Sequence, residues 1–329
     1  MIEIKNLTKQ YGSITAVNDI SFTANDNEIL GFLGPNGAGK STTMNMIVGY
    51  LPPTSGQILI DGMSMEENPR EVKKKIGYLP ELPPLYPEMR VKEYLKFVAG
   101  IKEVPKSERE HQVARALSRL KITDMKSRVI KNLSKGYRQR VGFAQALIGD
   151  PKVIILDEPT VGLDPNQTME VRSLINMLRK DHTVIFSSHI LQEVSAVCDR
   201  IVIIDKGRIR TVDSKENLTG QTEKTVYVLR VEEACEKCRE LLETVDGINE
   251  IIEANFIEDN RSEFRLDLEN DDVRKKILSI LLENDISIEE IKKETRSLED
   301  VFASYTRGKS APSSTLFAEQ EDKIPGSEE

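Results

Sequence analysis

The stretch GFLGPNGAGKSTT, residues 31–43, decides how this chain is interpreted. It contains the pattern G-x-x-x-x-G-K-S, which runs from Gly34 to Ser41. The glycines of such a loop let backbone N–H groups turn toward a bound phosphate, and the positive end of the following helix points at the same charge. The Lys40 amine can then reach the outer phosphates of a nucleotide, and the Ser41 hydroxyl can bind Mg²⁺. A strand-like run precedes the pattern and a helical run follows it, so we predict a nucleotide-binding loop rather than a glycine-rich turn without a ligand.

Strand-like apolar runs and helical patterns alternate around this loop over the first 218 or so residues. Several of the apolar runs have no polar face, which is typical of buried strands in a parallel sheet covered by helices. We expect strands at 28–33, 57–60, 153–156, 183–188 and 200–205, and helices at 41–51, 166–180 and 190–198. The sequence therefore predicts an α/β domain with a mixed, mostly parallel sheet.

A helical region interrupts this alternation between residues 84 and 149. Helical patterns follow one another there without an intervening strand, at 91–102, 107–121 and 136–149. We predict a helical subdomain inserted in the α/β domain, which as a whole spans residues 1–218.

The pattern restarts at about residue 222 in the order strand, helix, strand, strand, helix, strand. We expect strands at 224–231, 248–257, 262–269 and 286–293, and helices at 232–245 and 271–284. That order fits a split-βαβ, ferredoxin-like α+β unit, placed at 222–305. A last helix is expected at 297–306, with Ser297 as its N-cap. Residues 306–329 are polar and carry no period, so we predict a disordered tail.

Acidic and histidine side chains follow two of the predicted strands. Asp157 can bind the Mg²⁺ shell, and Glu158 can orient the attacking water or accept its proton. A strand that ends in solvated acids is common, so this segment gains its meaning from the phosphate-binding loop. His189 also lies at a strand end, where ligands bind in parallel sheets, and its position leaves open whether it touches phosphate. We interpret His111 and His182 as surface or packing residues.

Composition limits the class of protein. The chain has 329 residues, 39% of them hydrophobic and 30% charged, which is ordinary for a soluble globular protein of about two domains. Its net charge of −8 argues against a general nucleic-acid binder. The sequence contains no 18-residue apolar run and no signal-peptide pattern, so we expect a cytoplasmic chain. Cys198, Cys235 and Cys238 are too few for a disulfide framework, and the CEKC segment fits helix-packing thiols better than a metal site.

Taken together, the motifs resemble those of ABC-transporter ATPase subunits over roughly residues 1–218. The resemblance rests on GPNGAGKST, LSKGYRQR, VIILDEPTVGLDP and SSH, which occur in the family's order and spacing at 34–42, 133–140, 153–165 and 187–189. A closer similarity is to the ATP-binding subunits of ABC-2-type exporters, the gliding-motility and multidrug type. It is carried by GYLPELPPLYPEM at 77–89, by the LSKGYRQR turn and by SLEDVF at 297–302.

The resemblance implies a P-loop ATPase that hydrolyses ATP with Mg²⁺ in a head-to-tail homodimer, with two ATP molecules at the interface. Tyr11 would stack on adenine, His189 would contact the γ-phosphate, and Asp164 would span the dimer interface. Without the family, Tyr11 is an ordinary half-buried tyrosine and Asp164 an ordinary helix start.

The remaining site residues implied by the resemblance fall into four groups. The phosphates would be cradled by Gly34, Pro35, Asn36, Gly37, Ala38, Gly39, Lys40, Ser41 and Thr42. Catalysis would involve Glu158, His189 and Glu81, and Mg²⁺ would be bound by Ser41, Asp157 and Glu81. The signature turn, Ser134, Lys135, Gly136 and Tyr137, would approach the γ-phosphate bound by the opposite subunit. A helix start is a ready anion site, and a second one in a chain that already has a phosphate loop makes sense if it serves a neighbouring copy.

The sequence departs from the family pattern at three places. The family's signature is usually LSGGQ, whereas Lys135 and Tyr137 stand here in place of the first glycine and the glutamine. The lid-loop glutamine is Glu81, which adds a negative charge near the γ-phosphate; we hypothesise that Mg²⁺ neutralises it or that it swings away when the ion is absent. Asn27 replaces a common glycine, and asparagine tolerates the left-handed backbone conformation.

We therefore predict an ATP-hydrolysing motor that powers a separate membrane permease and lies on the cytoplasmic face of the membrane through that permease. By resemblance, the surface around residues 81–90 and the inserted helices would receive the permease's cytoplasmic helices. A soluble, non-transport ABC ATPase is disfavoured because the chain has one phosphate loop and no sustained heptads. A regulatory nucleotide-binding module is disfavoured by Glu158. The transported substrate and the role of the C-terminal unit stay open.

Overall fold

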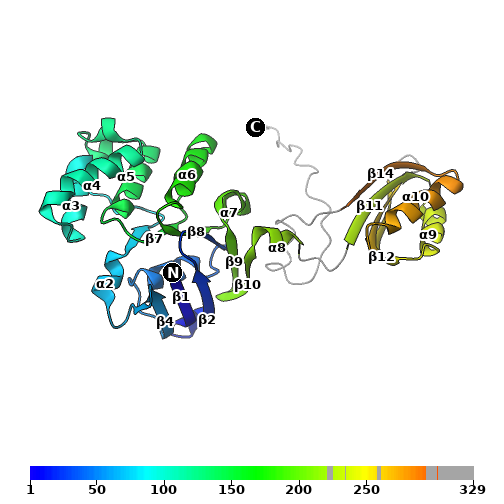
Figure 1. The fold of residues 1–329 in the computed structure, drawn as a ribbon, viewed down its shortest axis with the longest axis horizontal. Coiled ribbons are helices and arrows are strands. Elements are labelled where there is room, and N and C mark those ends of the chain that lie inside the picture. The colour runs from blue at the N-terminus through cyan, green and yellow to red at the C-terminus, as the bar shows by residue number, and fades with distance from the viewer. Residues whose placement is uncertain (221–224, 234, 258–260, 294–301, 303–329) are drawn as a thin grey trace, which may run out of the picture.

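The computed structural model describes residues 1–220, 225–233, 235–257, 261–293 and 302, and these residues form three sheets with surrounding helices (Figure 1). The predicted last helix, with the exception of Phe302, and the predicted tail lie outside the described residues. The fold class predicted from the sequence, α/β with a mixed, mostly parallel sheet and flanking helices, is confirmed.

The largest sheet has the strand order β10-β9-β3-β8-β7-β6. Its members are β3 (Ile29–Leu33), β6 (Ile76–Leu79), β7 (Val153–Asp157), β8 (Thr183–Ser188), β9 (Arg200–Asp205) and β10 (Arg208–Ser214). All neighbours are parallel except β9 and β10, which form an antiparallel edge. Strands β3, β7 and β8 are buried along their whole length, as their continuous apolar runs require.

A second, antiparallel sheet has the order β2-β1-β4-β5. Its strands are β1 (Ile2–Tyr11), β2 (Ile14–Ala24), β4 (Ser55–Ile60) and β5 (Met63–Ser64). The run at 57–60 belongs to this sheet rather than to the parallel one. The inward side chains of the antiparallel sheet, including Ile2 of β1 and Ile58 of β4, share one core with Phe32 of β3 and Ile155 of β7. The two sheets therefore pack on each other and fix the β1–β2 hairpin beside the phosphate-binding loop.

The helices that accompany these two sheets are α1 (Lys40–Ile47), α2 (Pro69–Lys74), α6 (Pro165–Leu178), α7 (Leu191–Val197) and α8 (Lys215–Gly220). Helix α1 is shorter than the predicted 41–51. Gly49 adopts a φ of 70°, and Tyr50 N donates to the Asn45 carbonyl at 2.9 Å. A left-handed glycine with such reversed hydrogen bonds terminates a helix.

The inserted helical region contains α3 (Val91–Ile101), α4 (Lys106–Arg119), the short 3₁₀ helices η1 (Thr123–Met125) and η2 (Ile130–Asn132), and α5 (Lys135–Leu147). Figure 1 shows α3, α4 and α5 grouped together at one end of the molecule. Their apolar sides, including Leu95, Leu117 and Val141, are buried in a core that continues into β7 through Leu156. This continuity anchors α5 to the strand that carries Asp157.

The C-terminal unit follows the order β11 (Thr225–Glu232), α9 (Cys235–Glu243), β12 (Ile248–Ile257), β13 (Arg261–Leu268), α10 (Val273–Glu283) and β14 (Ser287–Lys293). Its strands are ordered β12-β13-β11-β14 and all neighbours are antiparallel. One strand thus separates the members of each helix-linked pair, which is the split-βαβ arrangement expected for a ferredoxin-like unit. Cys238 is buried in its core and Cys235 packs against that core. No helix in the described part of the chain has the length and apolar character needed to cross a membrane.

Candidate functional site

The phosphate-binding loop connects the carboxyl end of β3 to α1. At Gly39 the φ is 104°, and a Cβ would lie 2.6 Å from the Ala16 carbonyl oxygen, so both conformation and space require glycine. The loop borders a cavity of about 450 Å³. From the loop this cavity is lined by Asn36, Gly37, Gly39, Lys40, Ser41 and Thr42, and from elsewhere by Ala16, Glu81, Glu158, Val161 and His189.

Asp157 ends β7 beside this loop. Its Oδ1 accepts hydrogen bonds from Ser187 Oγ at 2.6 Å and from Ser41 Oγ at 3.3 Å. Burial raises the pKa of the Asp157 carboxyl, while the two hydroxyls act in the opposite direction. A carboxylate next to a hydroxyl is the oxygen ligand set that Mg²⁺ uses when it bridges protein and phosphates. Ser41 and Asp157 therefore fit a magnesium ion.

Glu158 lies between the lysine of the loop and a histidine. Its Oε1 is 3.2 Å from Lys40 Nζ, and its Oε2 is 2.8 Å from His189 Nδ1. Its backbone has a φ of 47°, and its N–H donates to Ser187 Oγ at 3.0 Å. A non-glycine residue held in the left-handed region stores strain, and such residues concentrate at functional sites. Lys40 also donates to the Gly34 carbonyl at 2.8 Å.

The structure brings most of the predicted site residues together and leaves some outside the cavity. Glu81 lines it from the loop after β6. Tyr11 does not line it; this side chain is 45% exposed at the tip of the β1–β2 hairpin, with Lys9 Nζ 5.3 Å from the ring centroid. Ala16 lines the cavity without having been predicted, and only the fold of the hairpin brings it there.

The signature turn and the Asp164 loop form a surface separate from this cavity. Ser134 caps α5 by accepting from Tyr137 N at 3.4 Å, and Asp164 caps α6 by accepting from Gln167 N at 2.9 Å. A Cβ at Gly136 would lie 3.1 Å from the Gln167 side chain, so the start of α5 and the start of α6 approach each other closely here. None of these residues lines the cavity of their own chain.

Lys135 occupies a defined position on this surface. Its Nζ lies where a side chain at Gly162 would begin, 2.0 Å from that ideal Cβ position. The Lys135 amine therefore rests over the loop that leads to Asp164.

Comparison with known proteins shows the family of this chain. A family model described as "ABC transporter" matches residues 17–161. The ABC transporter ATP-binding protein YhcH of Bacillus subtilis (strain 168) is 35% identical, over 93% of this chain and 96% of the relative. The linearmycin resistance ATP-binding protein LnrL of the same organism is 31% identical, over 93% of this chain and 98% of the relative. The chain belongs to the ABC transporter ATP-binding proteins.

The solved structures agree with this assignment. The structure of the bacterial ABC transporter cassette MJ0796 aligns with 65% of this chain and with 98% of the MJ0796 chain, with a TM-score of 0.59 and 26% identity. That structure is a dimer. At 25% identity, a post-hydrolysis state of MJ0796 holds ADP and Pi. The present ATP-binding protein binds ATP and is an ATPase.

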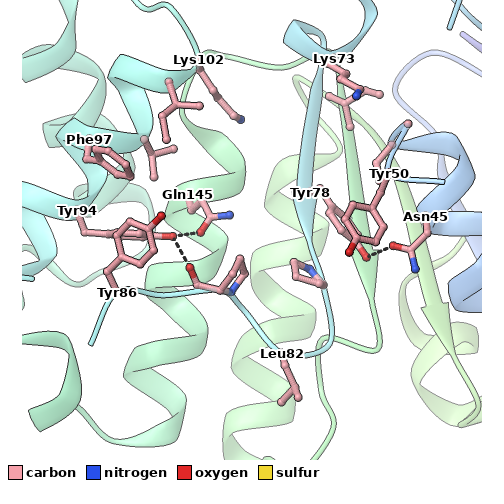
Figure 2. Close-up of a pocket in the computed structure, with 17 residues that line it drawn as sticks. Asn45, Tyr50, Lys73, Tyr78, Leu82, Tyr86, Tyr94, Phe97, Lys102 and Gln145 are labelled. Atoms are coloured by element: carbon pink, nitrogen blue, oxygen red, sulfur yellow. Dashed lines mark hydrogen bonds between the residues drawn. The ribbon is translucent and has the colours of Figure 1, made fainter. Parts of the chain in front are cut away.

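A second, larger cavity of about 950 Å³ lies in this ATP-binding protein where the sheets meet the inserted helices (Figure 2). Tyr50, Leu82, Tyr86 and Phe97 line it and are all substantially exposed, Leu82 to 82%. On the helical side Tyr94 donates to Gln145 of α5 and, at 3.4 Å, to the Pro84 carbonyl; on the sheet side Tyr78 donates to Asn45 at 3.3 Å. We call this cavity the apolar groove.

Proposed function

We propose that this ABC ATP-binding protein is the motor of an ABC-2-type exporter. Two copies join head to tail around two ATP molecules with Mg²⁺, and their closing and opening drive a separate permease at the cytoplasmic face of the membrane. The observation that carries the proposal is the loop from Pro80 to Pro84. Pro80, Leu82 and Pro84 line the apolar groove, whereas Glu81 lines the phosphate cavity.

This alternation provides a route for coupling. A partner seated in the groove contacts one side of the loop, and a nucleotide contacts the other. Because Glu81 and Leu82 are neighbours in the chain, a partner that displaces Leu82 also shifts Glu81. Exposed aromatic side chains around a concave apolar surface are typical of a protein-binding site, and we infer that a cytoplasmic helix of the permease fills it.

The dimer part of the proposal is supported by the separation of the signature turn from the chain's own cavity. Ser134 is exposed at the start of α5, and a hydroxyl together with the N-terminal end of a helix suits an anion. Apolar side chains near His189 are also exposed: Val161 to 38%, Ile190 to 38% and Met169 to 57%. They border a further cavity of about 490 Å³. A second copy that presents its signature turn to the nucleotide would cover them.

The chemistry follows from the contacts of the site residues. Ser41 and Asp157 would hold Mg²⁺, which when bound screens the charge of the phosphates. Lys40 exchanges its contact with Glu158 for phosphate oxygens. Glu158 then takes a proton from the attacking water, and His189 keeps the Glu158 carboxyl in place. The signature turn of the partner copy stabilises the outer phosphate.

Disrupting the groove tests the export role. Phe97→Glu places a charge in the groove, and Leu282→Glu places the same charge on an exposed leucine of α10, 65% exposed, as a control. With tagged chains purified from the native host's detergent-solubilised membranes, we expect a multi-span protein with the wild type and the control, and its loss with Phe97→Glu. Basal ATP hydrolysis of the purified protein should be equal in all three. Equal recovery of the multi-span protein with Phe97→Glu, or no multi-span protein with the wild type, would contradict the proposal.

A further inference from the structure

A buried carboxyl group on α7 joins two loops of the ATP site. Glu193 is 4% exposed, and its Oε2 accepts hydrogen bonds from Thr160 Oγ1 at 2.6 Å and from Ser188 Oγ at 2.8 Å. Thr160 is 5% exposed and Ser188 is fully buried. Breaking either hydrogen bond would leave a buried polar group unpaired, which costs free energy. Both hydroxyls are therefore firmly bound to this oxygen. None of the three residues touches the phosphate cavity.

The first loop held by Glu193 carries His189. Ser188 directly precedes this histidine, and Ser188 Oγ also accepts from the backbone N–H of Ile190 at 3.0 Å. The residues on both sides of His189 therefore depend on the same hydroxyl, which itself is fixed by Glu193.

The second loop follows Glu158. Thr160 lies two residues after Glu158 and starts a turn in which Leu163 N donates to the Thr160 carbonyl at 3.1 Å. Asp164 comes directly after this turn. From the other side, Gln139 of α5, 8% exposed, donates from Nε2 to the Pro159 carbonyl at 2.8 Å. The segment after Glu158 is thus held by α7 through Glu193 and by the signature helix α5 through Gln139.

We propose that Glu193 is a positioning residue that locks the His189 loop to the segment between Glu158 and Asp164. The 2.8 Å contact between His189 and Glu158 depends on the relative position of these two loops. Asp164 belongs to the second of these loops. Glu193 therefore also couples the position of the ATP-site loops to the surface that faces the second copy. This last step rests on the proposed head-to-tail dimer.

Substitutions at Glu193 and at its two hydroxyl partners separate the effect on catalysis from the effect on the dimer. Glu193→Ala should lower kcat for ATP by about ten-fold or more, since small displacements of reacting groups are costly, while binding of a fluorescent ATP analogue is unchanged. Glu193→Gln should restore most of kcat because its amide oxygen can still accept from both hydroxyls. Ser188→Ala should lower kcat, and Thr160→Val should lower the Hill coefficient for ATP. Added to Glu193→Ala, Thr160→Val should have no further effect, because residues of one network are not additive.

Ser195→Ala is the matched control, because it removes a hydroxyl from the same helix that donates to the Gln192 carbonyl at 3.3 Å rather than to Glu193. It should leave kcat, KM and the Hill coefficient unchanged. The proposal is overturned if Glu193→Ala keeps its kcat and Hill coefficient. It is equally overturned if kcat falls in strict proportion to the melting temperature across all variants with no rescue by Gln, which indicates a purely structural role. A wild type with a Hill coefficient of one would contradict the dimer instead, and would leave the predicted effects on kcat to decide the role of Glu193.

Discussion

Lys40 Nζ lies 3.2 Å from Glu158 Oε1, and both side chains are almost completely buried. The amine that should bind phosphate is therefore held by the carboxyl group that should act on water. A nucleotide has to take Lys40 away from Glu158, after which Glu158 keeps its contact with His189 Nδ1 at 2.8 Å. We infer that binding of the phosphates and release of the catalytic base are one event.

Replacing Lys40 should destabilise the protein in the absence of nucleotide. Lys40→Met leaves the buried Glu158 carboxyl without its cation, so we expect the free energy of unfolding in urea to fall by about 2 kcal/mol. The loss should be much smaller in a Glu158→Gln background, where no charge is left uncompensated. Lys5→Met, which breaks an exposed pair with Glu3, is the control. Equal losses in both backgrounds would show that the Lys40–Glu158 contact is not the cause.

Ser134 and Lys135 of the signature turn should differ in their importance for dimerisation. Ser134→Arg places a bulky cation at the exposed start of α5 and should abolish ATP-driven dimerisation. Lys135→Gly should preserve it, because Lys135 rests over Gly162 of its own chain. Light scattering with ATP present measures both. Loss of the dimer in Lys135→Gly would mean that this lysine takes part in binding the partner's nucleotide.

Glu81 should allow hydrolysis at a lower magnesium concentration than a glutamine does. Glu81 lines the phosphate cavity, where a second negative charge needs a cation beside it. With Glu81→Gln we expect half-maximal ATP hydrolysis at a higher Mg²⁺ concentration, because the ion loses an anionic ligand. A titration that superimposes on that of the wild type would refute the idea that Mg²⁺ neutralises this side chain.

Lys102 should make stability depend on pH. Its Nζ donates to the Ile148 carbonyl at 2.7 Å just past the end of α5, and burial lowers its pKa to about 8. In the unfolded chain the pKa of lysine is about 10.4, so between these values the unfolded state binds more protons and stability rises with pH.

Urea unfolding at about pH 7.5 and about pH 9.5 tests this sign. The wild type should gain stability relative to Lys102→Met at the higher pH. Lys73 is an exposed lysine that lines the same groove. The difference in stability between the wild type and Lys73→Met should not change between the two pH values. A difference between wild type and Lys102→Met that is constant with pH would contradict the expected titration.

The sequence predicted those parts of the fold and the site that depend on contiguous residues. Lys40, Ser41, Asp157 and Glu158 follow buried strands, and the carboxyl ends of parallel strands meet at one edge, so these groups had to converge. The β1–β2 hairpin was not predicted, because its register shifts repeatedly and interrupts the alternation of apolar residues. The strand at 57–60 was predicted, but nothing local indicates which sheet it joins.

Contacts between distant segments could not be predicted either. Ser187, which binds both Asp157 and the backbone of Glu158, is 30 residues away from Asp157. Glu193 looks like one more polar residue of a short helix until the fold places it beside Thr160. Its partners become visible only once α7 is packed against the sheet.

The most direct test of the central claim is the oligomeric state of Glu158→Gln with ATP and Mg²⁺. This variant keeps the size of the side chain, removes the base and frees Lys40 from a competing charge, so hydrolysis should fall by about 10²–10⁴-fold. Glu88→Gln, at an exposed surface glutamate, is the matched control. Light scattering should show a stable dimer of Glu158→Gln that holds two ATP molecules, with the control behaving as wild type. A Glu158→Gln protein that binds ATP but remains a monomer would contradict the head-to-tail motor.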